Sequence, residues 1–148
     1  MSTISTKSEE YRISELLRRS NLSVTEGRKK ILSLFLQSPD ALSHGDIEKK
    51  AGEKFDRVTV YRTLQAFVEK GLIHTIPTPD NSVRYALCKG CEEGHHHDDH
   101  VHFVCDNCGT TICLDDVVSP KINLPEGYTA RSVQVVINGT CKNCTPNP

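Results

Sequence analysis

The N-terminal residues alternate short amphipathic stretches with residues that begin or end helices. In residues 9–20 apolar side chains recur three and four positions apart, which places them on one face of a helix, and Ser8 is available as its N-cap. Thr25 can cap a second helix with a broad apolar face over residues 31–36. We expect that helix to end near Ser38, because a residue before proline avoids helical backbone angles.

Two further helices are predicted before the pattern changes. Residues 43–46 resemble a shortened capping box that opens a third helix, and Gly52 closes it. Asp56 can cap a fourth helix with the sequence RVTVYRTLQAFVEK, which ends at Gly71. Its apolar residues follow the spacing i, i+4, i+7 and i+8, so this helix buries one stripe and exposes the rest.

A β-hairpin is predicted directly after these helices. Residues 72–76 are rich in β-branched side chains, residues 77–82 have turn chemistry, and residues 83–87 alternate polar and apolar positions. Helices followed by such a hairpin are typical of a winged helix-turn-helix, in which the fourth helix reads DNA and the hairpin is the wing. We therefore predict a DNA-binding domain over residues 1–87.

The rest of the chain predicts a second, smaller unit. Residues 88–100 (CKGCEEGHHHDDH) are a polar hinge rich in His and Cys, without periodicity. Strand-like runs follow at residues 102–104, 110–114 and 132–137. The predicted fold class is α+β, with a winged helix-turn-helix followed by a small sheet-containing domain over residues 101–148, which the family resemblance given below implies is an α/β dimerisation domain stapled by a four-cysteine zinc site.

Composition adds an asymmetry between the two halves. In residues 1–87 Lys and Arg exceed Asp and Glu by 3, whereas in residues 88–148 the acidic residues exceed the basic ones by 4. A basic first half is compatible with a nucleic-acid partner. No run approaches the roughly 20 apolar residues of a membrane-spanning helix, and the first residues lack the pattern of a signal peptide. We expect a cytoplasmic protein without a membrane partner.

Cysteine spacing gives the strongest chemical signal. All 7 cysteines lie in the last 61 residues of the 148-residue chain, and two CxxC motifs stand 32 residues apart. In a reducing compartment such clustering favours metal over disulfides. Two CxxC turns at the ends of separate strands bring four thiolates to one tetrahedral point, which suits a structural zinc ion. The alternative is four free cysteines or two redox pairs. The predicted ligands are Cys105, Cys108, Cys141 and Cys144.

A second metal site is predicted where the wing meets the hinge. His74 and Cys88 flank the hairpin, which brings them near each other, and His100 and His102 share one face of an extended run. One thiolate and three imidazoles suit Zn²⁺ better than Fe²⁺ or Mn²⁺, and such a site would join the two domains. The alternative is a solvated His-rich loop that binds metal weakly.

The exposed face of the fourth helix holds the candidate DNA contacts. Towards the helix N-terminus, the end that typically meets base edges, the apolar stripe leaves five side chains more exposed, namely the four candidates below and Gln65. Arg62 could contact guanine or phosphate, and Tyr61 could meet a thymine methyl or a phosphate. The alternative is that Tyr61 packs inside and Arg62 pairs with a carboxylate. The four candidates are Arg57, Thr59, Tyr61 and Arg62.

These motifs together resemble the ferric uptake regulator family. The resemblance rests on TVYR at residues 59–62, Gly-Leu-Ile at 71–73, the His-rich segment, the Val-Cys-x-x-Cys-Gly motif at 104–109 and the final CxxC. It implies a homodimeric, metal-dependent DNA-binding repressor with an N-terminal winged helix and a C-terminal dimerisation domain. It also implies DNA contact by Tyr61 and Arg62 and a structural zinc on the four CxxC cysteines.

Within the family the chain is most similar to the zinc uptake regulators. Those proteins bind their regulatory metal through residues that match His74, Cys88, His100 and His102 here. Some of them have a glutamate where this chain has Cys113, so the resemblance makes Cys113 an alternative ligand. The chain also lacks a long helix between Leu114 and the last predicted strand.

The predicted function is therefore repression of metal-uptake genes by a homodimer on palindromic A/T-rich operator DNA, with zinc as corepressor. One alternative is an iron(II)- or peroxide-responsive member of the same family. Another is a zinc-buffering or protein-docking module without specific DNA binding. We expect no enzyme and no small organic substrate, because the chain contains neither H-E-x-x-H, nor H-x-E with P-C-x-x-C, nor G-x-S-x-G.

Overall fold

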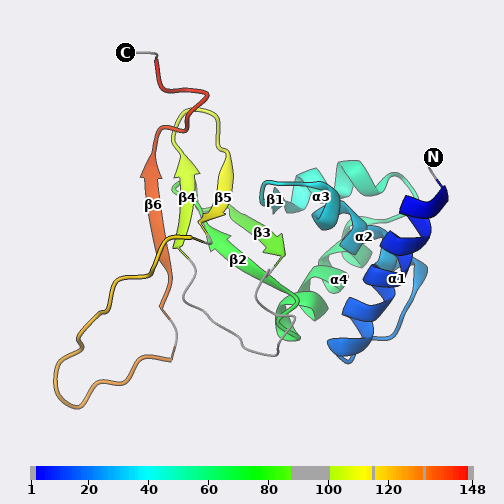
Figure 1. Cartoon of the computed structure of the whole chain (residues 1–148), viewed down its shortest axis with the longest axis horizontal. Helices are drawn as coiled ribbons and strands as arrows, with labels where there is room; N and C mark the ends of the chain where they lie inside the picture. The colour runs from blue at the N-terminus through cyan, green and yellow to red at the C-terminus, as the bar shows by residue number, and fades with distance from the viewer. Residues whose placement is uncertain (1–2, 88–100, 115, 132, 147–148) are drawn as a thin grey trace.

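A computed structural model describes residues 3–87, 101–114, 116–131 and 133–146 (Figure 1). These residues form an α+β fold in which four helices and a first sheet precede a second sheet. The elements in chain order are α1 (Thr3–Arg19), α2 (Glu26–Gln37), β1 (Leu42–Ser43), α3 (His44–Ala51), α4 (Arg57–Glu69), β2 (Ile73–Pro77), β3 (Val83–Leu87), β4 (Val101–Cys105), β5 (Thr111–Leu114) and β6 (Val135–Gly139).

The predicted N-cap residues form the expected hydrogen bonds at three of the four helices, α2, α3 and α4. The Arg28 amide donates to Thr25 Oγ1 at the start of α2, and the Thr59 amide donates to Asp56 Oδ1 at 2.7 Å at the start of α4. Helix α3 begins with a complete capping box between Ser43 and Asp46.

Helix α1 departs from the prediction. It begins at Thr3 rather than near residue 9, so Ser8 lies inside the helix and does not cap it. The stretch TISTKS carries no apolar stripe that could have revealed this extension.

The first sheet has the order β1-β3-β2 and contains the predicted hairpin. Gly71, at φ 72°, ends α4 and turns the chain into β2, since the Leu72 amide donates to the Phe67 carbonyl as in a Schellman motif. The two-residue strand β1 was not predicted, because so short a segment has no periodicity.

The second sheet has the order β5-β4-β6, with β5 antiparallel and β6 parallel to β4. Strand β6 starts at Val135, later than the predicted residue 132. Among residues 116–131, 133 and 134, which connect β5 to β6, no helix or strand is formed. Figure 1 shows this connection, coloured yellow to orange, extending away from both sheets.

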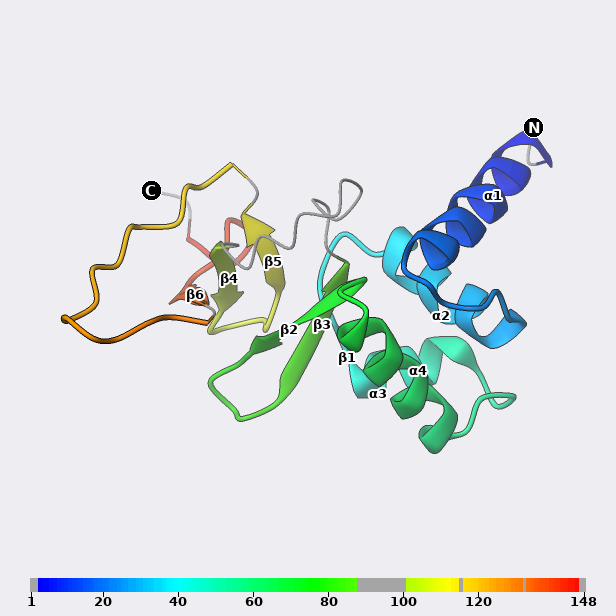
Figure 2. The same cartoon turned by 90° about the horizontal axis from the view of Figure 1, so that it is seen from below.

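The main core lies among the helices and the inner face of the first sheet. Its fully buried members include Leu17, Ile31, Ile47, Leu64 and Phe67. In both views of the molecule the first sheet lies between the helices and the second sheet (Figures 1 and 2). The second sheet buries few side chains among the described residues, chiefly Val101, Val104 and Cys105.

Candidate metal centres and DNA-binding face

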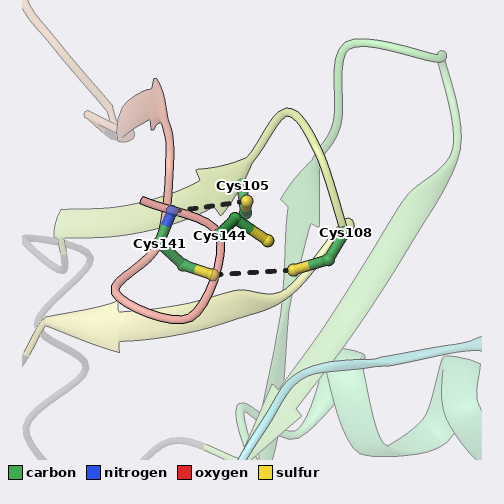
Figure 3. Close-up of side chains that lie close together, drawn as sticks. All are labelled: Cys105, Cys108, Cys141 and Cys144. Atoms are coloured by element: carbon green, nitrogen blue, oxygen red, sulfur yellow. Dashed lines mark hydrogen bonds between the residues drawn. The ribbon is translucent and has the colours of Figure 1, made fainter. Parts of the chain in front are cut away.

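The four CxxC cysteines come together at one edge of the second sheet. Strands β4 and β6 are parallel neighbours, so the turns that follow them meet at the same end of the sheet, the end where the strands terminate. In this pairing Cys105 lies opposite Gly139. All four Sγ atoms lie within 4.8 Å of one another (Figure 3). Cys108 Sγ is 3.7 Å from Cys141 Sγ, and the Cys141 amide donates to Cys105 Sγ at 3.3 Å.

This geometry fits a tetrahedral zinc ion. Zn–S bonds of about 2.3 Å place two thiolates about 3.8 Å apart in a tetrahedron, close to the Cys108–Cys141 separation of 3.7 Å. Four thiolates fill the coordination shell and leave no position for substrate or water, which is typical of a structural site. Gly109, at φ 76°, closes the first turn in a conformation that glycine adopts without steric cost.

The pKa values of two of these thiols are shifted in opposite directions. Hydrogen bonds from the backbone of Cys108 and Cys141 lower the pKa of Cys105 to about 6. A contact with Asn107 lowers the pKa of Cys144, but the surrounding thiols outweigh it and raise that pKa to about 11. Four thiolates this close repel one another, and a bound dication would remove that repulsion.

A second group of metal-binding side chains joins the two sheets. It consists of His74 on β2, His102 on β4 and Cys113 on β5, whose candidate ligand atoms lie within 4.8 Å of one another. The Nε2 atoms of the two histidines are 2.9 Å apart, and Cys113 Sγ is 3.4 Å from His74 Nε2. His102 is buried, while the other two side chains are partly buried.

Strand register explains this second group. His102 and Cys113 are direct partners in the β4–β5 pair, so their side chains project from the same face of the sheet. His74 reaches them from the wing. Of the four predicted regulatory ligands, His74 and His102 come together, whereas Cys88 and His100 lie outside the described residues. Two imidazoles and a thiolate form a donor set that suits zinc.

Cys113 is the candidate metal ligand that reasoning from the sequence itself did not select. Only the family resemblance indicated it, as an alternative ligand. The β4–β5 hairpin would have identified it, because pairing the strands on either side of the CDNCG turn places residue 113 opposite residue 102.

A small contact between the sheets surrounds this group, and we call it the joint. It consists of a hydrogen bond from the Ala41 amide to the Thr111 carbonyl at 2.9 Å and a cluster of Ala41, Ile76 and Ala86, against which Cys113 packs. Ile76 is fully buried there. At the joint, the two sheets are therefore held together by apolar packing, a backbone hydrogen bond and the His74–His102–Cys113 group.

The candidate DNA-binding residues lie together on the N-terminal half of α4. Val60, Leu64 and Phe67 are fully buried, and this orients the other face of the helix towards solvent. Tyr61 is 53% exposed, so it does not pack inside. Arg62 forms no ion pair with a carboxylate in the described part of the chain. The exposed set is Arg57, Thr59, Tyr61 and Arg62.

The same face contains a shallow hollow beside Tyr61. The hollow has a volume of about 450 Å³ and is lined by residues of α3, α4 and β3, namely His44, Arg57, Val58, Tyr61 and Tyr85. The rings of His44 and Tyr61 lie 6.5 Å apart. This face offers cationic, aromatic and apolar groups, the types that contact phosphates and thymine methyls.

Within the described residues, no helix has the length and apolar character needed to cross a membrane.

Comparison with known proteins finds relatives among regulators of metal uptake and of a peroxide operon. The model of the ferric uptake regulator family matches residues 19–138. The chain is 33% identical over 105 residues to a zinc uptake regulation protein of Mycobacterium tuberculosis, covering 68% of this chain and 75% of that protein. It is 27% identical over 139 residues to the peroxide operon regulator of Bacillus subtilis, covering 88% and 90%.

Among solved structures, the fold is similar to that of a zinc uptake regulator complexed with zinc and DNA. The TM-score is 0.70 at 23% identity, and the similarity covers 97% of this chain and 96% of the other. At this level of identity the comparison supports the shared fold.

Proposed function

The chain belongs to the ferric uptake regulator family, and from this premise we propose that it is a metal-dependent transcriptional repressor that binds operator DNA as a homodimer, with zinc as its corepressor. Members of this family are transcription regulators and not enzymes. The proposed target is palindromic A/T-rich operator DNA of metal-uptake genes, bound in the cytoplasm.

One observation carries the proposal: metal-binding side chains from both sheets converge at the joint. His74 belongs to the sheet that packs on α4, whereas His102 and Cys113 belong to the sheet that holds the CxxC cysteines. A metal bound by all three would link the DNA-reading helices to the second sheet. Such a position is what a corepressor site requires.

In the proposed mechanism, residues 1–87 are the DNA-binding domain, 88–100 the hinge and 101–148 the dimerisation domain. Without metal, the DNA-binding domain is proposed to take many orientations relative to the dimerisation domain. The regulatory ligands are proposed to be His74, Cys88, His100 and His102, and they hold the domain at the spacing of the two operator half-sites. A ligand shifts such an equilibrium only by its differential affinity, typically about 1–3 kcal/mol, or 5–150-fold.

The proposed DNA contacts are Arg57, Thr59, Tyr61 and Arg62. In a helix-turn-helix protein the N-terminal residues of the recognition helix contact base edges. The exposure of all four side chains, together with the buried stripe behind them, supports this role. We assign Arg62 to guanine or phosphate and Tyr61 to a thymine methyl or a phosphate.

Zinc is proposed at both centres, with different roles. Cys105, Cys108, Cys141 and Cys144 would hold a structural ion, because their thiolates complete its shell. The site at the joint would hold the regulatory ion. Its imidazoles and thiolate favour zinc, and the 33% identity to a zinc uptake regulation protein agrees with that choice. The similarity to a peroxide operon regulator keeps iron(II) as the second candidate.

Fluorescence anisotropy on a palindromic A/T-rich duplex tests the proposal. Free Zn²⁺ is buffered and varied, Fe²⁺ is tested anaerobically, and salt is fixed because phosphate contacts make affinity strongly salt-dependent. We expect zinc to tighten binding at low free concentration. Arg62→Ala should weaken binding about 5–150-fold, as for loss of a base contact of about 1–3 kcal/mol. Lys70→Ala, which removes a cation at the opposite end of α4, is the matched control and should have little effect.

Other results would reject parts of the proposal. Equal or better activation by Fe²⁺ would make the chain an iron- or peroxide-responsive member of the family. DNA binding that ignores both metals would reject the corepressor mechanism and favour a zinc-buffering or docking module. Equal losses in Arg62→Ala and Lys70→Ala would reject the assigned recognition face.

A further inference from the structure

We propose that Arg84 is the charge partner of the zinc-loaded four-cysteine site, and that Arg84 and Asp46 together couple this site to the DNA-binding domain. Arg84 does not bind the metal; it acts on the ion through the sulfur ligands and is a positioning residue. The coupling to DNA binding rests on the proposed function, whereas the charge pairing requires only that the four cysteines hold zinc.

Strand register places Arg84 on the face of the wing that meets the second sheet. Arg84 on β3 is the direct cross-strand partner of Ile76 on β2, so the two side chains project from the same face. Ile76 is fully buried at the joint. The Arg84 side chain therefore points towards the second sheet.

The guanidinium of Arg84 reaches the first CxxC turn. A side-chain carbon at position 109 would lie 3.6 Å from Arg84 Nη2, which is van der Waals distance. Arg84, Cys105 and Gly109 also line one cavity of about 170 Å³, which lies between the wing turn and the CxxC turn. In Figure 3 the pale green wing passes beside the turn that contains Cys108. A cation thus lies next to the turn that carries two of the four sulfur ligands.

Zinc in the four-cysteine site would give this cation a partner. Zn²⁺ contributes two positive charges and four thiolates contribute four negative ones, so the loaded site is a dianion. Groups around the ligands stabilise such a charge, and the Cys141 amide is one of them, since it donates to Cys105 Sγ. Arg84 adds a full positive charge, which a guanidinium keeps throughout the physiological pH range.

Arg84 has donor capacity left for this role. Its Nη1 atom lies 3.3 Å from Asp46 Oδ2, while its Nε atom is buried without a hydrogen-bond partner in the described part of the chain. Asp80 and Asp106 also line the cavity, but among the described residues neither forms an ion pair with Arg84. The Asp80 carboxylate instead accepts from the amide and hydroxyl of Ser82. The cavity leaves room for the guanidinium to turn towards the sulfur atoms.

Asp46 connects the same guanidinium to the DNA-binding helices. Asp46 Oδ2 accepts from the Ser43 amide at 3.1 Å in the α3 capping box and from Arg84 Nη1 at 3.3 Å. One guanidinium thus joins the N-terminus of α3 to the zinc-binding turn. Coupling of this kind is reciprocal. If the contact stabilises the loaded site, the loaded site stabilises the contact to the same extent.

Lys142 is a second basic residue close to the cysteines, because it stands inside the second CxxC motif. Its side chain is exposed, so solvent and salt screen its charge. The Arg84 side chain is only 26% exposed, which strengthens its electrostatic interactions. Lys142 therefore provides a matched control, since it carries the same charge near the same sulfur atoms.

Zinc retention tests the charge pairing. The full-length protein, with one equivalent of zinc bound by the four cysteines, is titrated with a chromophoric chelator. Arg84→Gln should weaken zinc retention about tenfold, as for other groups that support metal ligands, and Arg84→Lys should restore part of it. Lys142→Gln should change retention by less than about twofold. Asp46→Asn should retain zinc like the unchanged protein, because it removes a competitor for the guanidinium and leaves Arg84 in place.

DNA binding at full zinc occupancy tests the coupling. Arg84→Gln and Asp46→Asn should each weaken binding to the A/T-rich duplex about fivefold, the lower end of typical coupling between sites. Lys142→Gln should bind like the unchanged protein. Equal DNA affinities in all four proteins would overturn the coupling to the DNA-binding domain.

The charge pairing is overturned if Arg84→Gln retains zinc like the unchanged protein, or if Lys142→Gln loses as much. It is also overturned if Asp46→Asn releases zinc as readily as Arg84→Gln, because the ion pair would then serve folding alone. Should Arg84→Gln fail to fold, Arg84→Met answers the same question. If the unchanged protein shows no zinc-dependent DNA binding while the retention pattern holds, the proposed function fails and the charge pairing stands.

Discussion

Truncation of Ile76 offers a quantitative test of the coupling between the joint and metal binding. Ile76 is fully buried in the cluster with Ala41 and Ala86, against which Cys113 packs. Replacing a buried isoleucine by alanine costs about 2–5 kcal/mol. Cys113 of the other sheet packs against this cluster, so part of the loss falls on the contact between the sheets, and we take this part as about 1 kcal/mol.

Metal binding at the joint should weaken by a corresponding factor. The ligands meet only when the two sheets are in contact, so the apparent dissociation constant rises as the fraction of closed molecules falls. A loss of about 1 kcal/mol corresponds to roughly fivefold weaker Zn²⁺ binding. The assay is competition with a chromophoric chelator, after the four-cysteine site has been filled, with urea unfolding measured in parallel.

A matched variant separates coupling from general destabilisation. Ile47 is also fully buried, but it lies in the core among the helices. Ile47→Ala should lower the free energy of unfolding by a similar amount and leave Zn²⁺ affinity unchanged. Equal Zn²⁺ affinities in the two variants would refute the reasoning, as would an Ile76→Ala protein that binds Zn²⁺ like the unchanged chain. Ile76→Val, which costs about 0.5–1.5 kcal/mol, serves if the alanine variant does not fold.

Three further predictions concern the four-cysteine site, a helix cap and the wing. Cys105→Ser should remove one zinc per chain and unfold the second sheet, whereas Cys88→Ser should keep thermal stability and weaken the zinc response in DNA binding; equal losses of thermal stability would contradict this division. Ser43→Ala should lower the free energy of unfolding in urea by about 1 kcal/mol through loss of the α3 cap, and Ser43→Gly by only a few tenths. Hydrogen bonds from Ser82 and Thr78 lower the pKa of Asp80 to about 2, so its contribution to stability is complete above pH 3.8 and is lost as the pH falls towards 2. Thermal melts of Asp80→Ala should lack this part of the acid dependence, and an NMR titration midpoint of Asp80 at its ordinary value would show that the hydrogen bonds are absent.

The sequence predicted those features that depend on local chemistry. Thr25, Ser43 and Asp56 identified helix starts because capping acts over three residues. The two CxxC motifs predicted that their four cysteines lie together, because each motif specifies two thiolate ligands and the tight turn that holds them side by side. The wing was recognised from two alternating runs around a turn.

Other features depend on contacts between segments that are distant in the chain. The joint brings residue 41 to residue 111 and residue 74 to residues 102 and 113, and no local pattern encodes such pairings. The alanines at the joint carry no sequence signal, since a small apolar residue suits many environments. For the same reason the parallel pairing of β6 with β4 emerged only with the fold, and Cys113 was indicated by the family resemblance but not by any local pattern.

The hydrogen bond from Ala41 to Thr111 also provides a built-in reporter. Its donor belongs to the segment before β1 and its acceptor to the other sheet, so this amide is protected from exchange with deuterated water only while the sheets touch. Its protection factor therefore measures the closed fraction in solution, without DNA and without a label. Operator binding depends both on how often the molecule is closed and on how well the closed molecule fits the DNA. Measuring the exchange of this one amide while zinc is added reports the first of these properties without the second.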